Sequence, residues 1–381
     1  MSVVGRGTRW RWVAVALGVA AAIGLPTVVP TAASMLDRAG QPAARPAPAE
    51  LVALALASTD VAHEGIAQTR GSLGLPDLPR LGGVPDLLGS TTKTRVWWSS
   101  PQSWRVDLLS ASGEVDTYGS GTDLVQWDFE DRELTFVVGS DGARLPRADD
   151  LLPPQAVRWI LTALGPDDEL SPLADRWVAG RSAAGVRVVP ADERSTVARV
   201  DLWIDVDSGL PVEAHVVGMD GRDALESRFL QLDVTAPDPA VLRPPDPSGV
   251  RRDWTSTQDL AAAVDLNAPW RLPDALAGLP ASRTVLQGTA TYGAGLVRFA
   301  VLPLPPDLAG DTLDAAVTAG AVALDVAGGE AVLVTSTVLN AVVARGADRD
   351  HAYVLAGFVT PETLETAARE LLADPPPRRF T

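Results

Sequence analysis

The stretch that decides the fold is residues 95–138, which reads RVWWSSPQSWRVDLLSASGEVDTYGSGTDLVQWDFEDRELTFVV. Within it, short segments alternate apolar with polar residues. The apolar members are Trp104, Val106 and Leu108, then Val125, Trp127 and Phe129, then Leu134, Phe136 and Val138. A period of two is the pattern of strands with one apolar and one solvated face. It predicts four or five successive strands. Because the stretch has no cysteine or histidine, it favours a surface that holds an apolar ligand over a catalytic site.

The composition limits the possible partners of the chain. Its 381 residues are enough for two domains, each with a core of its own. The formal net charge is −16, and residues 1–34 hold three arginines and no acid, so the remainder carries −16 − 3 = −19. So acidic a body is not drawn to nucleic acid or anionic headgroups by its overall charge. With no cysteine, disulfides and a lipid-acceptor cysteine are both excluded.

The N-terminus has the pattern of a targeting segment. Three arginines precede an apolar run from Trp12 to about Ala33, and small residues near position 33 offer a cleavage site. The uninterrupted part, Trp12 to Leu25, has the length of a signal peptide and is shorter than a full membrane span. Residues 1–34 are therefore expected to be a signal peptide or an uncleaved membrane anchor. In either case we expect the rest of the chain to be exported to the cell envelope.

Residues 35–49 are rich in proline and alanine and predict a spacer, and a first domain is expected over residues 50–235. A helix is expected from Glu50 to about Ala62, and another over Pro153–Leu164, where proline stands at the start. Roughly ten strands joined mostly by short turns account for the rest. The prediction is an α+β fold with a curved antiparallel β-sheet or half-barrel and helices that cover it.

The leucine-rich stretch at residues 71–94 interrupts this pattern with glycine and proline, which exclude a long helix or a central strand. Either it is an ordered connector, or it is a mobile flap over a pocket. Near the end of the domain, Asp207-Ser208-Gly209 is a hairpin-turn signal between two alternating segments.

A proline-rich linker is expected at residues 236–252, followed by a smaller α+β domain at residues 253–373 and a tail at 374–381. In the second domain we expect a helix near 258–264 and strands near 283–291, 296–302, 331–337 and 352–358. Thr360-Pro361-Glu362 then begins a helix that ends near Leu372, because these residues suit the N-cap and the first turn.

Signals for catalysis or metal binding are weak throughout the chain. Ser90-Thr91-Thr92-Lys93 matches the SxxK pattern of serine acylases, but it lies in a Gly/Pro-rich loop and has no companion motif. His63, His215 and His351 are far apart, and His63-Glu64 lacks the second histidine of a zinc helix. Asp205-x-Asp207 and Asp348-x-Asp350 fit turns better than calcium loops. We therefore expect no catalytic residue, no metal and no cofactor.

Eleven tryptophans stand out in a chain otherwise poor in aromatic residues. They could be core and rim residues of a sheet, or some of them could line a cavity between a curved sheet and a covering helix. On the second interpretation, the residues expected to line the cavity are Trp97, Trp104, Val106, Leu108, Val125, Trp127, Phe129, Phe136, Trp159 and Leu161.

Two segments of the first domain resemble a known superfold. They are residues 100–137, with SPQSWRVDLL at their start, and residues 199–234, with DVDSGLPV at 205–212. Together they are similar to the lipoprotein-carrier superfold shared by LolA, LolB, LppX-type lipid binders and the N-terminal domain of RseB/MucB. In the second domain, YGAGLV at 292–297 and YVLAGFVTPETL at 353–364 resemble segments of the RseB/MucB C-terminal domain. LolA and LppX-type proteins lack that domain.

The resemblance implies a non-enzymatic regulator. Members of the RseB/MucB family sense lipid or mislocalised lipoprotein in the first domain and bind the extracytoplasmic part of an anti-sigma factor. For this chain it implies an acyl chain of a lipid or lipoprotein as ligand and an anti-sigma factor as partner. A lipid or lipoprotein carrier of the LolA/LppX type is the alternative, and a cell-wall hydrolase that uses Ser90 and Lys93 is a third hypothesis.

Overall fold

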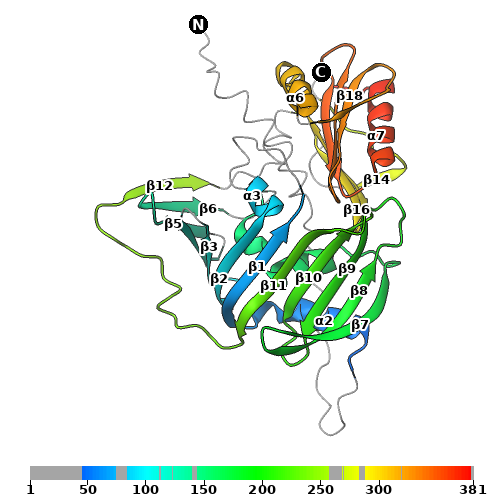
Figure 1. Ribbon diagram of the computed structural model, residues 1–381. Coiled ribbons are helices and arrows are strands. Elements are labelled where there is room, and N and C mark those ends of the chain that lie inside the picture. The colour runs from blue at the N-terminus through cyan, green and yellow to red at the C-terminus, as the bar shows by residue number, and fades with distance from the viewer. Residues whose placement is uncertain are drawn as a thin grey trace.

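The structure is a computed structural model, and it describes residues 45–73, 84–110, 113–121, 123–139, 144–256, 268, 270–282, 288–318 and 320–378. Its strands form one sheet of 12 strands and one of eight (Figure 1). The predicted α+β fold with a curved, open and largely antiparallel sheet is confirmed. The expected targeting segment and most of the spacer lie outside the described residues. No helix among those described is long and apolar enough to cross a membrane.

The first sheet has the strand order β12-β6-β5-β4-β3-β2-β1-β11-β10-β9-β8-β7. All neighbours are antiparallel except β12 and β6, which run parallel. The strands are β1 (His63–Gly71), β2 (Thr91–Ser100), β3 (Ser103–Leu109), β4 (Glu114–Ser120), β5 (Asp123–Asp128), β6 (Glu133–Val138), β7 (Glu169–Val178), β8 (Arg181–Val189), β9 (Val197–Asp205), β10 (Pro211–Gly218), β11 (Asp223–Asp233) and β12 (Arg251–Ser256). The deciding stretch thus forms most of β2 and all of β3 to β6.

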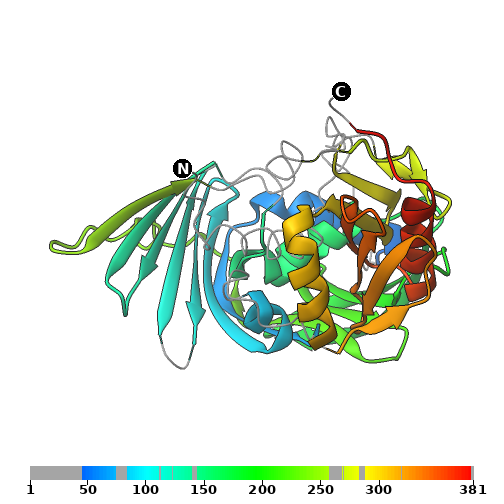
Figure 2. The same ribbon diagram turned by 90° about the horizontal axis from the view of Figure 1, so that it is seen from above.

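Helices cover one face of this sheet, which we call the inner face; the opposite face is the outer face. They are α2 (Pro48–Ala57), the 3-10 turn η1 (Ser58–Asp60), the 3-10 turn η2 (Ala148–Leu151) and α4 (Pro153–Thr162). Proline stands at the start of both α2 and α4, where no backbone N–H is needed. Leu51 of α2 and Val157 of α4 join Val186 and Leu202 of the sheet in one buried cluster. Figure 2 shows the sheet curving around these helices.

The leucine-rich stretch contains a short helix, α3 (Val84–Gly89). Leu73, Leu87 and Leu88 are buried in the cluster beneath α2 and α4. Leu75, Leu78 and Leu81 lie outside the described residues, so the choice between connector and flap stays open as a prediction.

The hairpin predicted at Asp207-Ser208-Gly209 joins β9 to β10, as expected. Gly209 has a φ of +73°, a backbone conformation that glycine adopts without strain. The carboxylate of Asp205, at the end of β9, accepts hydrogen bonds from the Ser208 backbone N–H at 3.3 Å and from Arg181 Nε at 2.8 Å. Asp205 therefore has the turn role that its spacing favoured.

Strand β12 spans the end of the expected linker and the start of the expected second domain. After β11 the chain runs to the far edge of the first sheet and pairs with β6, with Trp254 opposite Phe136 (Figure 1). All six residues of β12 are exposed. The predicted boundary between residues 252 and 253 therefore falls inside a strand of the first sheet.

The second sheet has the order β13-β14-β15-β16-β20-β19-β18-β17. Its strands are β13 (Ala275–Leu276), β14 (Leu279–Ser282), β15 (Ala290–Ala294), β16 (Val297–Pro303), β17 (Val322–Leu324), β18 (Gly329–Val334), β19 (Asn340–Gly346) and β20 (Ala352–Gly357). Helices α6 (Pro306–Thr318) and α7 (Pro361–Ala373) lie on its two faces (Figures 1 and 2). Helix α7 begins after Thr360, as predicted. The helix expected near residues 258–264 lies outside the described residues.

The two sheets are joined by hydrogen bonds and apolar contacts. The backbone N–H of Thr196 donates to the Phe358 carbonyl at 3.2 Å, and that of Thr360 donates to the Arg194 carbonyl at 2.8 Å. Trp159 of α4 meets the ring of Phe358 edge to face at 6.0 Å. We call the part of the chain that forms the second sheet the second part. Its Leu296 and Val338 are buried in the same cluster as α2 and α4. The second part therefore packs directly on the helices that cover the inner face.

Candidate functional site

Strand register divides the predicted cavity residues between the two faces of the first sheet. Opposite residues of antiparallel strands lie on the same face, and Trp104 of β3 is opposite Gly119 of β4, which is opposite Leu124 of β5. The inner-face residues are thus Trp104, Val106 and Leu108. By the same pairing, the outer-face residues are Trp97, Val125, Trp127, Phe129 and Phe136. Instead of one apolar face, these strands have apolar side chains on both.

Exposure follows this division only in part. On the inner face Trp104 and Val106 are buried and Leu108 is half-buried. On the outer face Phe129 is 65% exposed, while the other four residues are half-buried. The two candidates on α4 also separate, since Leu161 is buried against the sheet and Trp159 packs on Phe358. The structure thus groups Trp104, Val106, Leu108 and Leu161 on the helix-covered side.

A row of aromatic rings runs across the inner face of β3, β2, β1 and β11. Trp104 stacks on Trp98 with ring centroids 5.9 Å apart, and Trp98 stacks on His63 at 6.1 Å. The ring of Phe229 meets His63 edge to face at 5.8 Å. Gly119 makes room for the row, because a Cβ there would come within 2.1 Å of the Trp104 ring. The Nε1–H of Trp98 is satisfied by the Thr59 carbonyl at 3.1 Å.

Sequence reasoning missed the place of His63 in this row. The imidazole is fully buried, and its Nδ1 lies 2.8 Å from the Val61 carbonyl oxygen. Burial lowers the pKa of His63 to about 4, so the ring is neutral at physiological pH. The available signal was its place at the start of a strand whose alternate residues Gly65, Ala67 and Thr69 leave room on the inner side.

Polar residues gather beside this row, where η1, the start of β1 and α4 meet. Arg158 of α4 donates from Nη1 to the Ser58 hydroxyl at 3.4 Å. The exposed carboxylate of Asp60 is close enough to influence the guanidinium, but burial outweighs it and lowers the pKa of Arg158 to about 10. One turn earlier on α4, both amide atoms of Gln155 are buried without a hydrogen-bond partner. No local sequence pattern marks this group, because its members come from three separate segments.

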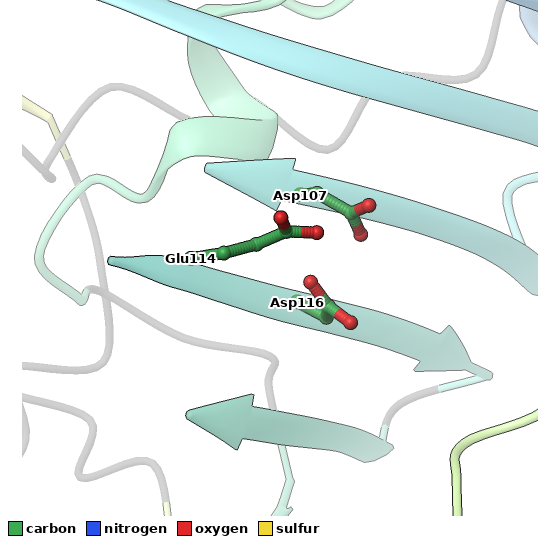
Figure 3. Close-up of side chains that lie close together, drawn as sticks. All are labelled: Asp107, Glu114 and Asp116. Atoms are coloured by element: carbon green, nitrogen blue, oxygen red, sulfur yellow. The ribbon is translucent and has the colours of Figure 1, made fainter. Parts of the chain in front are cut away.

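The outer face holds a compact charged cluster on β3 and β4: Asp107, Glu114 and Asp116 (Figure 3). Their carboxylate oxygens lie within 4.8 Å of one another, and no other group in the described part of the chain has ligands so placed for a metal ion. Asp107 is fully buried, and Asp116 is 6% exposed. Three converging carboxylates could coordinate a hard cation, so their local charge balance decides the interpretation.

Arginine side chains neutralise most of that cluster. Arg105 holds Asp107 through Nε and Nη2 at 2.6 and 2.9 Å and reaches Asp116 at 2.8 Å. Arg95 pairs with Glu114 and lies 3.5 Å from Asp107. A cation would have to compete with two guanidinium groups that already occupy these oxygens. The arrangement is an ion-pair network, and it gives no reason to revise the expectation that metal is not used.

Asp116 is the least satisfied member of the network. Its Oδ2 accepts from Arg105 and from the Tyr118 hydroxyl at 3.3 Å, whereas its Oδ1 is buried without a partner. Burial, assisted by the charge of Asp107, raises the pKa of Asp116 to about 7. One proton can therefore be shared within the network near neutral pH.

At the free edge of the first sheet, the outer face also has an exposed aromatic patch. Trp254 of β12 is 64% exposed and stacks on Phe136 at 5.0 Å. Beside them, Trp127 and Phe129 meet edge to face at 6.5 Å. Three residues of this patch, Trp127, Phe129 and Phe136, were expected from the sequence to line a cavity. In the structure it lies on the side without helices.

The remaining candidate groups have ordinary local roles. The Ser90 hydroxyl donates to the Asp86 carbonyl at 2.6 Å at the end of α3 and is exposed, an arrangement that does not activate a nucleophile. His215 hydrogen-bonds Glu213 at 2.8 Å, and His351 stacks on Trp270 at 3.7 Å. Neither contact brings imidazoles together as metal ligands.

No protein-family model matches the sequence, and no curated protein matches it. Solved structures similar to this chain include those of MucB, as the resemblance in the sequence predicted. The Pseudomonas aeruginosa MucA/MucB complex is 20% identical, covers 84% of this chain and 96% of that chain, and has a TM-score of 0.47. MucB in complex with MucA(peri) is 18% identical at the same coverage, with a TM-score of 0.45.

Other solved structures are similar to about half of this chain. A LolA superfamily protein from Nitrosomonas europaea is 11% identical, covers 52% of this chain and 97% of that chain, and has a TM-score of 0.21. At these identities the likeness concerns the fold.

Proposed function

We propose that this chain is an exported, non-enzymatic regulator that binds an acyl chain of a lipid or lipoprotein at the inner face of its first sheet. The observation that carries the proposal is the inner face itself. It combines a continuous aromatic row with aliphatic side chains of the sheet and of α4. Burying apolar area contributes about 25 cal/mol per Å², so an acyl chain could bind without a charged group.

The partner in this proposal is the extracytoplasmic part of an anti-sigma factor, with the second part of the chain as its docking unit. Support comes from the resemblance of residues 292–297 and 353–364 to the RseB/MucB C-terminal domain. The direct contacts between the second part and α4 support a route by which a ligand at the inner face could influence that partner.

A pair of matched variants tests the acyl site. Leu108 and Val125 are both half-buried aliphatic residues of the same sheet, but they lie on opposite faces. Delipidated protein would be titrated with palmitate, and the bound fraction read by native mass spectrometry. Leu108→Asp should weaken binding by about tenfold or more, whereas Val125→Asp should leave it unchanged, because only Leu108 faces the helices. Equal effects of the two variants would refute an inner-face site.

A lipid or lipoprotein carrier is the second candidate, since it would use the same apolar face. The discriminating experiment mixes loaded protein with acceptor vesicles and, separately, with the extracytoplasmic segment of an anti-sigma factor from the same organism. A regulator should bind that segment with an affinity that palmitate changes. A carrier should deliver the acyl chain to vesicles and ignore the segment.

A further inference from the structure

We propose that Arg158, His63 and Ser58 form a headgroup site for an amphiphile whose acyl chain lies on the inner face and whose headgroup carries a phosphate and a hydroxyl. The proposal rests on the proposed function and specifies which acyl ligands that face selects. The three residues lie where η1, β1 and α4 converge: Ser58 begins η1, His63 begins β1, and Arg158 is in the middle of α4.

His63 supplies an unused hydrogen-bond acceptor. Because its Nδ1 faces a carbonyl oxygen at 2.8 Å, Nδ1 must carry the ring proton. Its Nε2 therefore has a bare lone pair, and that atom is buried without a partner. Trp98 stacks on the imidazole and Phe229 contacts it edge to face, so the imidazole cannot rotate freely toward another donor. A buried acceptor in this state calls for a donor from outside the protein.

Arg158 supplies an unpaired cation. In the part of the chain that the structure describes, no carboxylate lies within ion-pair distance of its guanidinium, and its hydrogen-bond partner is the Ser58 hydroxyl. Arg105, by contrast, is held by Asp107 and Asp116. A guanidinium presents planar N–H groups that match phosphate oxygens in pairs. Since Asp60 is exposed and solvated, it leaves this donor set available.

Gln155 extends the same site along α4. It precedes Arg158 by three residues, a spacing that places two side chains on neighbouring positions of a helix surface. Its amide has both a donor and an acceptor buried without partners. Partnerless polar groups lower stability, so their concentration beside an apolar row is better explained by a polar ligand than by folding.

The chemistry of these groups defines the ligand. Arg158 favours an anion with several oxygens, and the Nε2 of His63 requires a hydroxyl or N–H donor close to that anion. A phosphate ester on a glycerol backbone with a free hydroxyl satisfies both. A fatty acid has the anion without the hydroxyl, and a neutral monoacylglycerol has the hydroxyl without the anion.

Three probes with saturated chains of the same length separate these contributions: palmitoyl lysophosphatidic acid, 1-palmitoylglycerol and hexadecyl phosphate. Delipidated full-length protein would be titrated with each, below micelle-forming concentrations, by isothermal calorimetry. Lysophosphatidic acid should bind wild type about tenfold tighter than 1-palmitoylglycerol. Arg158→Gln should abolish this preference without weakening 1-palmitoylglycerol. His63→Phe should bring lysophosphatidic acid close to the affinity of hexadecyl phosphate.

Two further variants serve as controls. Arg222→Gln changes an arginine whose side chain is 78% exposed and paired with Asp220, and it should alter none of the affinities. Arg158→Lys keeps the cation and should retain most of the preference for the phosphate-bearing probe. This variant tests the site even if Arg158→Gln does not fold.

The outcomes separate the two proposals. If wild type binds lysophosphatidic acid and 1-palmitoylglycerol equally, or if Arg158→Gln keeps the preference, the headgroup site is wrong and the acyl site stands. If none of the three probes binds wild type, the proposed acyl function fails and the headgroup site fails with it.

Discussion

Replacing Asp116 by asparagine should remove a pH dependence from the stability of the first sheet. Burial raises the pKa of Asp116 from 3.8 to about 7. The stability that the protonated group contributes is therefore complete below about pH 4 and is lost as the pH rises through about 7. Asparagine has the shape of the protonated acid and cannot ionise. It can still accept a hydrogen bond from Arg105 in the place of Oδ2.

The size of the effect follows from the same shift. A pKa shift of about three units, at about 1.36 kcal/mol per unit, sets an upper limit near 4 kcal/mol on the stability that is lost when Asp116 ionises. We expect about 2 kcal/mol, because Arg105 and Tyr118 can tighten their hydrogen bonds to Asp116 as it ionises. Wild type and Asp116→Asn should thus be equally stable at low pH, and the variant should be about 2 kcal/mol more stable at high pH.

The assay is urea unfolding of both proteins at several pH values from about 3.5 to 8, followed by tryptophan fluorescence. His215 also has a raised pKa, because its pairing with Glu213 outweighs burial, so wild-type stability alone would mix two groups. The difference between wild type and variant isolates Asp116. If the variant is less stable than wild type at pH 8, the ionised carboxylate stabilises the folded protein through its ion pair with Arg105, and the reasoning from a raised pKa would be refuted.

Three further pairs of variants test separate parts of the fold. Gly119→Ala should destabilise the protein by about 2 kcal/mol or more in urea unfolding, because the new Cβ would clash with the Trp104 ring. The control Gly121→Ala, in the adjacent open turn, should cost about 1 kcal/mol. If Gly119→Ala is tolerated, the aromatic row is wrong. Trp254, which is 64% exposed, should cost about 1 kcal/mol of unfolding free energy when replaced by alanine. Trp270, which is 4% exposed, should cost about 3 kcal/mol. A larger loss of stability for Trp254→Ala would mean that β12 is more firmly held than its exposure indicates. Arg158→Met should raise stability by about 1 kcal/mol, because it removes a buried cation that has no carboxylate partner among the described residues. Arg187→Met removes a bidentate pair with Asp201 and should lower stability by about 0.5 kcal/mol. A loss of stability in Arg158→Met would show that the charge of Arg158 stabilises the fold.

Alternation predicted the strands of residues 95–138 but not the face on which each side chain lies. The period of two fixes which residues of one strand share a face, while the pairing between strands decides which face that is. In β5 the pattern favoured Val125, Trp127 and Phe129 as the buried set. The ladder places Leu124 opposite Gly119 on the inner face instead, so Leu124 is 3% exposed and Phe129 is 65% exposed.

Other elements escaped prediction for physical reasons. Strand β12 is exposed on both faces, so it has no alternation, and it follows a proline-rich stretch typical of linkers. Helix α6 contains Gly310, which weakens the helical pattern around Leu308 and Leu313. By contrast, α7 was predicted from its start, because Thr360-Pro361-Glu362 combines three independent preferences of a helix N-terminus. The polar site at Arg158 depends on contacts between distant segments, and no local pattern encodes it.

The central claim is that an acyl chain binds between the helices and the inner face of the first sheet. The most direct test is photocrosslinking of delipidated protein with a palmitate that carries a diazirine near its chain end, followed by peptide mapping. We expect adducts on β3 and α4, at positions such as Trp104, Val106, Leu108 and Leu161. Adducts confined to Trp127, Phe129 and Trp254 would place the acyl chain on the exposed patch of the outer face and contradict it.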